Sequence, residues 1–242
     1  FPPTPFLFAR PSDWISEFAV RMFVKVGSDI FKYIPPSLAM NIKKISKIIA
    51  FIFVIAGLVL ILGKRVRFPD FYNPMFMGAM AFVAAFLIFS LRLILRPNNP
   101  EQEKILDLIQ ISLVAGLSFN ALGALGLFQL YKLGFQYDKL LHFLNPFVFT
   151  IVFAKSYEQW RKFSFKKSII LSIIIIFLLG AVWETYEFVG DALFKTKMLG
   201  LYGEFVTEDT IWDLVMNCFG IITAVVGLSI FRRSNSHYCY FN

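Results

Sequence analysis

Six long apolar segments constrain this chain more than any other feature. A helix that crosses a membrane needs about 20 mainly apolar residues, and lipid cannot satisfy backbone polar groups left outside helices or closed barrels. The segments cover residues 45–62, 74–95, 105–131, 138–154, 168–189 and 210–231, the fourth being the shortest. We therefore expect an all-α, polytopic membrane protein with about six transmembrane helices.

Composition agrees with this class of protein. The chain has 242 residues, of which 57% are hydrophobic and 17% charged, whereas a soluble domain is about 25% charged. The net charge of +8 does not indicate nucleic-acid binding, because the basic residues lie mostly between the apolar segments and form no basic face with interleaved aromatics. We expect membrane lipids as partners, through their anionic head groups, and no nucleic acid.

The first 44 residues have a different pattern from the rest. Their apolar side chains recur on one broad helical face, at Ile15, Phe18, Met22, Phe23, Val26 and Ile30. A basic amphipathic helix of this kind usually lies in the membrane interface, and a docking helix for a partner subunit is the alternative. The sequence thus predicts an N-terminal interfacial segment (1–44), a six-helix transmembrane domain (45–231) and a short C-terminal tail (232–242).

Charge between the segments predicts the orientation. The stretch "KSYEQWRKFSFKK" after the fourth segment holds five basic residues against Glu158 alone, which places it in the cytoplasm. Alternation then puts both termini in the cytoplasm, in the cell or inner membrane. The stretch "GKRVRFPD" disagrees, because its three basic residues would face outside.

Hairpin connectivity brings three segment ends to one membrane face: the start of the fourth, the end of the fifth and the start of the sixth. Each end carries polar residues spaced for one side of a helix. They are Asp138, Lys139, His142 and Asn145, then Glu184, Glu187 and Asp191, then Asp209, Asp213 and Asn217. Charged groups at membrane depth are costly unless they face the interior and have partners. We therefore expect one acidic pocket, on the outer face.

Carboxylates outnumber cations in this set, so a bound cation, protonation or water must offset the excess. Oxygen ligands with one histidine favour Mg²⁺, Mn²⁺ or Ca²⁺, and a catalytic Zn²⁺ site also accepts such ligands. The predicted metal ligands are His142, Glu187, Asp191 and Asp209. Glu184 and Asp213 are the predicted acid/base residues, and Lys139 is expected to contact an anionic head group. A structural hydrogen-bond network is the alternative interpretation.

Three motifs carry a resemblance to a known family. The stretches "YDKLLHFLNPF", "WETYEFVGD" and "EDTIWDLVMNCFG" resemble the YjdF-like inner-membrane proteins and, more distantly, the VanZ-like group, over residues 131–227. The VanZ-like group is associated with resistance to a glycopeptide antibiotic, so the resemblance implies a role in the cell envelope. This chain departs from that group in having Glu187 where glutamine is common, and in lacking an arginine just before Asp209.

Three functions remain open from the sequence. The first is a cation-dependent intramembrane enzyme acting on a lipid or a lipid-linked envelope substrate. The second is a non-catalytic accessory subunit of a larger membrane complex. The third is an ion- or proton-coupled carrier, which the placement of the polar residues at one end disfavours, since carriers usually bind near the membrane midplane.

Overall fold

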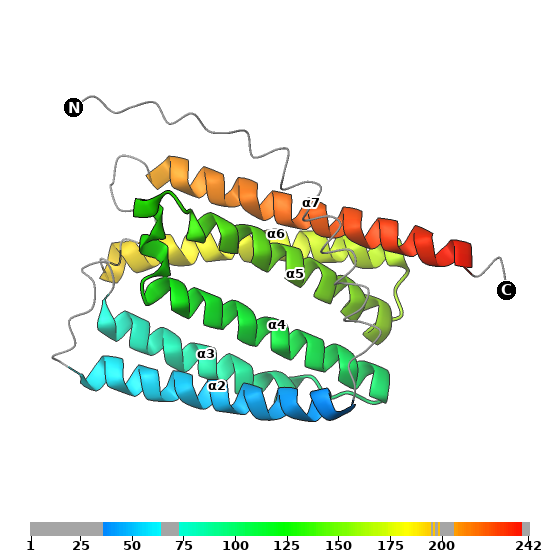
Figure 1. Cartoon of the computed structure of the whole chain (residues 1–242), viewed down its shortest axis with the longest axis horizontal. Helices are drawn as coiled ribbons and strands as arrows, with labels where there is room; N and C mark the ends of the chain where they lie inside the picture. The colour runs from blue at the N-terminus through cyan, green and yellow to red at the C-terminus, as the bar shows by residue number, and fades with distance from the viewer. Residues whose placement is uncertain (1–35, 64–72, 195, 197, 199–205, 239–242) are drawn as a thin grey trace. The chain divides into compact units, whose positions relative to one another are not determined.

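The computed structural model describes residues 36–63, 73–194, 196, 198 and 206–238, and every regular element within them is helical. The elements are α2 (Pro36–Leu62), α3 (Pro74–Ile94), α4 (Pro100–Ala124), the 3₁₀ helix η1 (Leu127–Leu133), α5 (Tyr137–Trp160), α6 (Phe165–Phe194) and α7 (Val206–Tyr238), as drawn in Figure 1. Six of them are long and apolar enough to cross a membrane. The predicted all-α polytopic membrane fold is confirmed. The predicted interfacial helix lies outside the described residues.

Asparagine caps and prolines explain two helix starts. The Asn73 side chain accepts hydrogen bonds from the backbone N–H groups of Met75 and Phe76, at 3.0 and 3.3 Å, and Asn99 accepts one from Gln102 at 2.9 Å. A proline follows each cap, where a missing N–H costs no helical hydrogen bond. These Asn-Pro pairs fix where α3 and α4 begin.

Several helix bounds differ from those predicted. The third apolar run was expected to continue to residue 131, but α4 ends at Ala124 because Gly126 has a φ of 137°, which no α-helix accommodates. The chain then forms η1 before α5. Helices α2, α5, α6 and α7 all extend beyond the apolar runs, since polar residues continue a helix where it leaves the lipid; α7 continues to Tyr238, into the predicted tail.

Small residues allow α2 and α3 to pack closely. A Cβ atom added to Gly57 would lie 3.0 Å from the carbonyl oxygen of Gly78, and the reverse distance is also 3.0 Å. Such glycine contacts are typical of helix pairs in membranes. Ala50, Ile88 and Val114 then form a small core shared by α2, α3 and α4.

The outward surface of the helices is strongly apolar. Phe51, Phe86 and Phe177 are 61%, 67% and 47% exposed, although a soluble protein would bury most side chains of this kind. Acyl chains are the natural environment for this surface. Polar residues are instead buried in the compact unit of residues 35–224, which contains every site residue described below.

Candidate functional site

Three helix ends supply one buried polar group. Helix α5 contributes residues from its first two turns, α6 from its last three turns and α7 from its first three. We call this group the acidic pocket. It consists of Asp138, Lys139, His142, Glu184, Glu187, Asp209, Asp213 and Asn217. The group from three separate helices predicted from the sequence is thus present in the structure.

A close approach of α5 and α7 builds one wall of the acidic pocket. A Cβ atom added to Gly220 would overlap the carbonyl oxygen of Phe143 and lie 3.1 Å from the backbone nitrogen of Phe147. Only glycine fits there, because the neighbouring atoms belong to rigid helical backbone. The contact places Asp213 and Asn217, which precede Gly220 by two turns and one turn, beside the first turns of α5.

Helix α5 also has an interrupted backbone ladder at the pocket. Pro146 lies inside the helix. Since proline has no N–H group, Pro146 cannot donate the hydrogen bond that the carbonyl of His142 would receive in a regular α-helix. The gap in the ladder falls at the histidine of the pocket.

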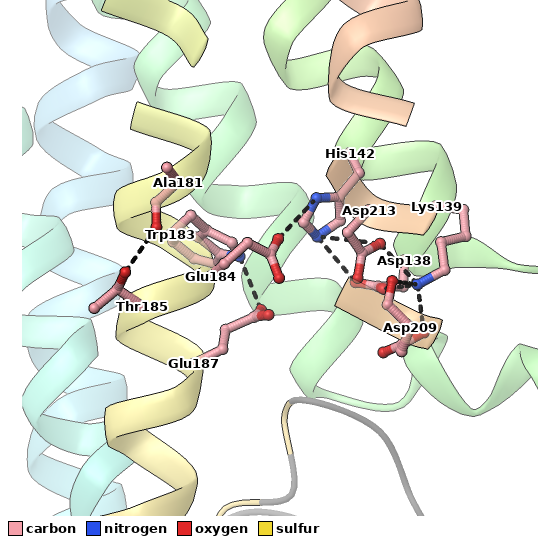
Figure 2. Close-up of polar contacts among 10 residues, drawn as sticks. All are labelled: Asp138, Lys139, His142, Ala181, Trp183, Glu184, Thr185, Glu187, Asp209 and Asp213. Atoms are coloured by element: carbon pink, nitrogen blue, oxygen red, sulfur yellow. Dashed lines mark hydrogen bonds and ion pairs between the residues drawn. The ribbon is translucent and has the colours of Figure 1, made fainter. Parts of the chain in front are cut away.

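Lys139 neutralises one side of the acidic pocket. Its Nζ lies 2.7 Å from Asp213 Oδ1 and 3.3 Å from Asp138 Oδ2, and it also donates to Asp209 (Figure 2). The Lys139 side chain is 17% exposed and Asp213 is 2% exposed. Lys139 therefore bonds to carboxylates of its own chain. The contact with an anionic head group stays a prediction.

His142 lies between the two sides of the pocket, as Figure 2 shows. Its Nε2 is 3.6 Å from Asp213 Oδ1 and 3.7 Å from Asp138 Oδ1. Its Nδ1 faces the other way, 3.7 Å from Glu184 Oε1. Asn217 of α7 is 5% exposed and belongs to the same buried group. Both ring nitrogens thus face carboxylates, at distances somewhat longer than a hydrogen bond.

The two glutamates of α6 are buried and have few hydrogen-bond partners among the described residues. Glu184 and Glu187 are each 8% exposed. Glu187 Oε1 accepts a hydrogen bond from Trp183 Nε1 at 2.8 Å, whereas neither carboxylate oxygen of Glu184 has a hydrogen-bond partner among the described residues. A buried carboxylate without partners is costly. Glu184 is therefore the group in the pocket that most needs a further partner.

Two sets of three residues have the spacing of metal ligands within the described part of the chain. One set is Asp138, His142 and Asp213, and the other is His142, Glu184 and Glu187; in each, one ligand atom per residue lies within 4.8 Å of the others. Each set combines one imidazole nitrogen with two carboxylates. Both are compatible with a divalent cation by ligand type.

Some predicted site residues lie elsewhere. Asp191 accepts hydrogen bonds from Thr196 Oγ1 and the backbone N–H of Met198, at 2.5 and 2.6 Å, so its carboxylate holds the chain that follows α6. Asn145 faces α4, with its Oδ1 3.3 Å from where a Cβ on Gly116 would lie. Neither of these residues, nor the predicted ligand Asp209, belongs to either set of candidate ligands.

A second buried polar group was not predicted from the sequence. We call it the arginine cluster; it consists of Lys43, Arg92, Glu103, Asp107 and Gln110. Arg92 Nη1 lies 2.8 Å from Glu103 Oε1, and the guanidinium also donates to Asp107 and Gln110. Lys43 Nζ lies 2.6 Å from Glu103 Oε1. The sequence did contain a feature that predicts this cluster. Arg92 lies near the end of one apolar segment and Asp107 near the start of the next, and a hairpin brings those ends together.

Comparison with protein families identifies the chain's relatives. A family model described as "Predicted membrane protein (DUF2238)" matches residues 46–234, which include nearly all of the six spans. The chain belongs to this family. No curated protein and no solved structure matches the chain. The family match extends well beyond residues 131–227, on which the YjdF-like resemblance rests, and the VanZ-like relation stays a prediction.

Proposed function

We propose that this member of the DUF2238 family is a cation-dependent intramembrane enzyme that acts on a lipid or a lipid-linked envelope substrate. One observation carries the proposal: His142 is buried among carboxylates from three helices, and Glu184 among them has no hydrogen-bond partner in the described part of the chain. Purely structural groups at membrane depth are usually fully paired. Excess buried carboxylate next to an imidazole is the arrangement that a metal ion completes.

The chemistry would be metal-assisted hydrolysis. A bound divalent ion would activate a water molecule and polarise a phosphoryl or carbonyl oxygen of the substrate. The water oxygen would bond to phosphorus or carbon as the bond to the leaving group breaks, and a carboxylate would accept the water's proton. Glu184 and Asp213 are the candidates for that base.

Surroundings of the acidic pocket favour a substrate that arrives through the membrane. Trp212 directly precedes Asp213 in the chain and is 54% exposed. Phe188 directly follows Glu187 and is 63% exposed. Tryptophan side chains are enriched at the level of the head groups, so Trp212 indicates that the pocket lies near that level. A lipid whose phosphate sits at that level could reach the pocket from the side without leaving the bilayer.

The same proposal places the acidic pocket on the outer face and both chain termini in the cytoplasm, on the basis of the charge between α5 and α6. Single cysteines at Ser164, in that connection, and at Gln136, before α5, test the orientation in a chain whose own Cys218 and Cys239 are replaced by serine. A membrane-impermeant thiol reagent applied to intact cells should label the cysteine at Gln136 and spare the one at Ser164. The opposite labelling would refute the orientation.

Activity is tested with purified protein against a panel of phospholipids and lipid-linked phosphates, with Mn²⁺ added or chelated. We expect hydrolysis that needs the ion and falls about 100-fold or more in Glu184→Ala and Asp213→Ala. Glu101→Ala, an exposed acidic residue in the first turn of α4, is the matched control and should retain activity. Bound metal absent from the purified protein, together with full function of both pocket variants in cells, would refute the proposal.

An accessory subunit is the second candidate, because Lys139 already pairs with three carboxylates as a structural network would. In that case native purification should recover associated chains, and pocket variants should lower the yield of the complex. A catalytically active protein purified without other chains would exclude this role.

A further inference from the structure

We propose that the two sides of the acidic pocket hold different cations. The ammonium of Lys139 is the resident cation of the aspartate side, and the divalent ion binds on the glutamate side, between His142 Nδ1, Glu184 and Glu187. This inference rests on the proposed function and deepens it, because it selects one of two candidate ligand sets.

The aspartate side is already filled. Lys139 Nζ lies within 3.3 Å of oxygens from both Asp138 and Asp213, which are the two carboxylates of the first candidate set. A divalent ion bound to the same oxygens would stand beside a fixed positive charge in a partly buried site, where charges of like sign repel strongly. Lys139 has to leave before an ion can enter.

The glutamate side has no such cation among the residues that the structure describes. No lysine or arginine is paired with Glu184 or Glu187 among the described ion pairs, and both Glu184 oxygens lack hydrogen bonds. Glu184 is more than nine-tenths buried, with its carboxylate directed toward His142 (Figure 2). Two ligands of one ion are at most about 4–5 Å apart, since each bond is about 2.0–2.6 Å long. The candidate ligand atoms of His142, Glu184 and Glu187 all lie within 4.8 Å of one another, which is compatible with that range.

The orientation of His142 agrees with this assignment. A histidine bound to metal through one nitrogen usually donates its other N–H to a carboxylate, which fixes the ring and the tautomer. With Nδ1 on the ion, Nε2–H faces Asp138 and Asp213, at 3.7 and 3.6 Å. Lys139 holds both of these carboxylates, so the aspartate side positions the ring that binds the ion.

The ligand set also indicates the kind of ion. Ca²⁺ prefers six to eight oxygen ligands and Mg²⁺ keeps several waters, whereas imidazole with two carboxylates suits a transition-metal ion. We therefore expect a divalent ion of the Mn²⁺ or Zn²⁺ type. Glu184 then serves as a ligand of the ion and not as the base of the proposed reaction.

Binding of Mn²⁺ to the purified, chelator-treated full chain tests the inference. Wild type should bind one ion, and Glu184→Gln and Glu187→Gln should each weaken binding by at least about tenfold. Lys139→Met should retain the first ion and gain a second, because the freed aspartates form a second site. Asp191→Asn is the matched control and should bind like wild type, since that carboxylate holds the chain after α6.

A measurement on the unmutated protein guards against variants that fail to fold. With ¹⁵N-labelled histidine, pulsed electron paramagnetic resonance should detect one histidine nitrogen on the bound Mn²⁺; the chain has two histidines, His142 and His237, and His237→Gln should keep the signal. Absence of any bound ion would overturn both the inference and the proposed function. An ion without histidine coupling, or one lost in Asp138→Asn but kept in Glu184→Gln, would overturn the inference alone.

Discussion

The acidic pocket and the arginine cluster both bury charged side chains between helices, but the two groups differ in how these charges are balanced. The arginine cluster lies beside the connection of α3 to α4 and sets two cations, Lys43 and Arg92, against two carboxylates. The acidic pocket begins where α5 starts, on the far side of α4 and η1. It sets Lys139 and His142 against five carboxylates: Asp138, Glu184, Glu187, Asp209 and Asp213.

Charge balance separates the two groups. Both carboxylates of the arginine cluster are paired with a cation, although Asp107 Oδ2 has no hydrogen-bond partner among the described residues. In the arginine cluster, one guanidinium reaches two carboxylates and an amide, as a structural clamp between helices would. In the acidic pocket, the aspartates are paired with Lys139, whereas the buried Glu184 has no hydrogen-bond partner among the residues described by the structure. The difference favours a structural role for the first group and a ligand for the second.

Removing the arginine should give the largest effect. Arg92→Met would leave Asp107, which is fully buried, without its cation, and we expect a loss of about 3–5 kcal/mol in the free energy of unfolding. Unfolding of the detergent-solubilised protein by heat or by sodium dodecyl sulfate measures it. The double variant Arg92→Met/Asp107→Leu should recover much of the loss. If the double variant is as unstable as the single one, the cluster does more than balance charge.

Widening the α5–α7 contact should come next. Gly220→Val would force side-chain atoms against the backbone of Phe143 and Phe147, and we expect a loss of about 2–3 kcal/mol. Mn²⁺ affinity should fall with it, because Asp213 and Asn217 move away from His142. Phe219→Leu, at the adjacent and outward-facing position, is the control and should change neither stability nor affinity. Normal affinity in Gly220→Val would show that the ion does not depend on α7.

Removing the lysine of the acidic pocket should cost less than removing Arg92. Asp138 and Asp209 are 34% and 30% exposed at their side chains, so water can partly replace Lys139 there, and the buried Asp213 still has His142 Nε2 at 3.6 Å. We expect Lys139→Met to lose about 1–2 kcal/mol without metal and to regain it in excess Mn²⁺, as thermal unfolding with and without the ion would reveal. No rescue by Mn²⁺ would count against a cation site formed by these aspartates.

The smallest effect is expected at the rim of the arginine cluster. Lys43 is 48% exposed at its side chain, and surface ion pairs contribute about 0–1 kcal/mol. Lys43→Gln should therefore change the melting temperature only slightly, and the change should shrink as salt is added. A loss as large as that of Arg92→Met would mean that the two cations act as one unit.

The sequence was sufficient to predict the membrane spans, because they follow from hydropathy. It was also sufficient to predict that three helix ends meet, because hairpin connections determine which ends share a membrane face. It was insufficient for side-chain partners. Nothing in the spacing told whether Lys139 would turn toward lipid or toward Asp213, since both lie within reach of its long side chain. Asp191 fell on the predicted stripe, yet the chain beyond α6 folds back onto it. The ion pair of Arg92 and Asp107 joins two different apolar segments, so it could not be found by considering each segment separately.

Pro146 has a mechanical consequence for the pocket. The helical turn that carries Asp138, Lys139 and His142 joins the remainder of α5 across a position where one main-chain hydrogen bond cannot form. That turn can tilt at a lower cost than a regular helical turn, because the main-chain hydrogen bond to the carbonyl of His142 is already absent. The three pocket residues of α5 thus lie on a hinge within the helix, while the glutamates lie on a helix whose interior contains no proline.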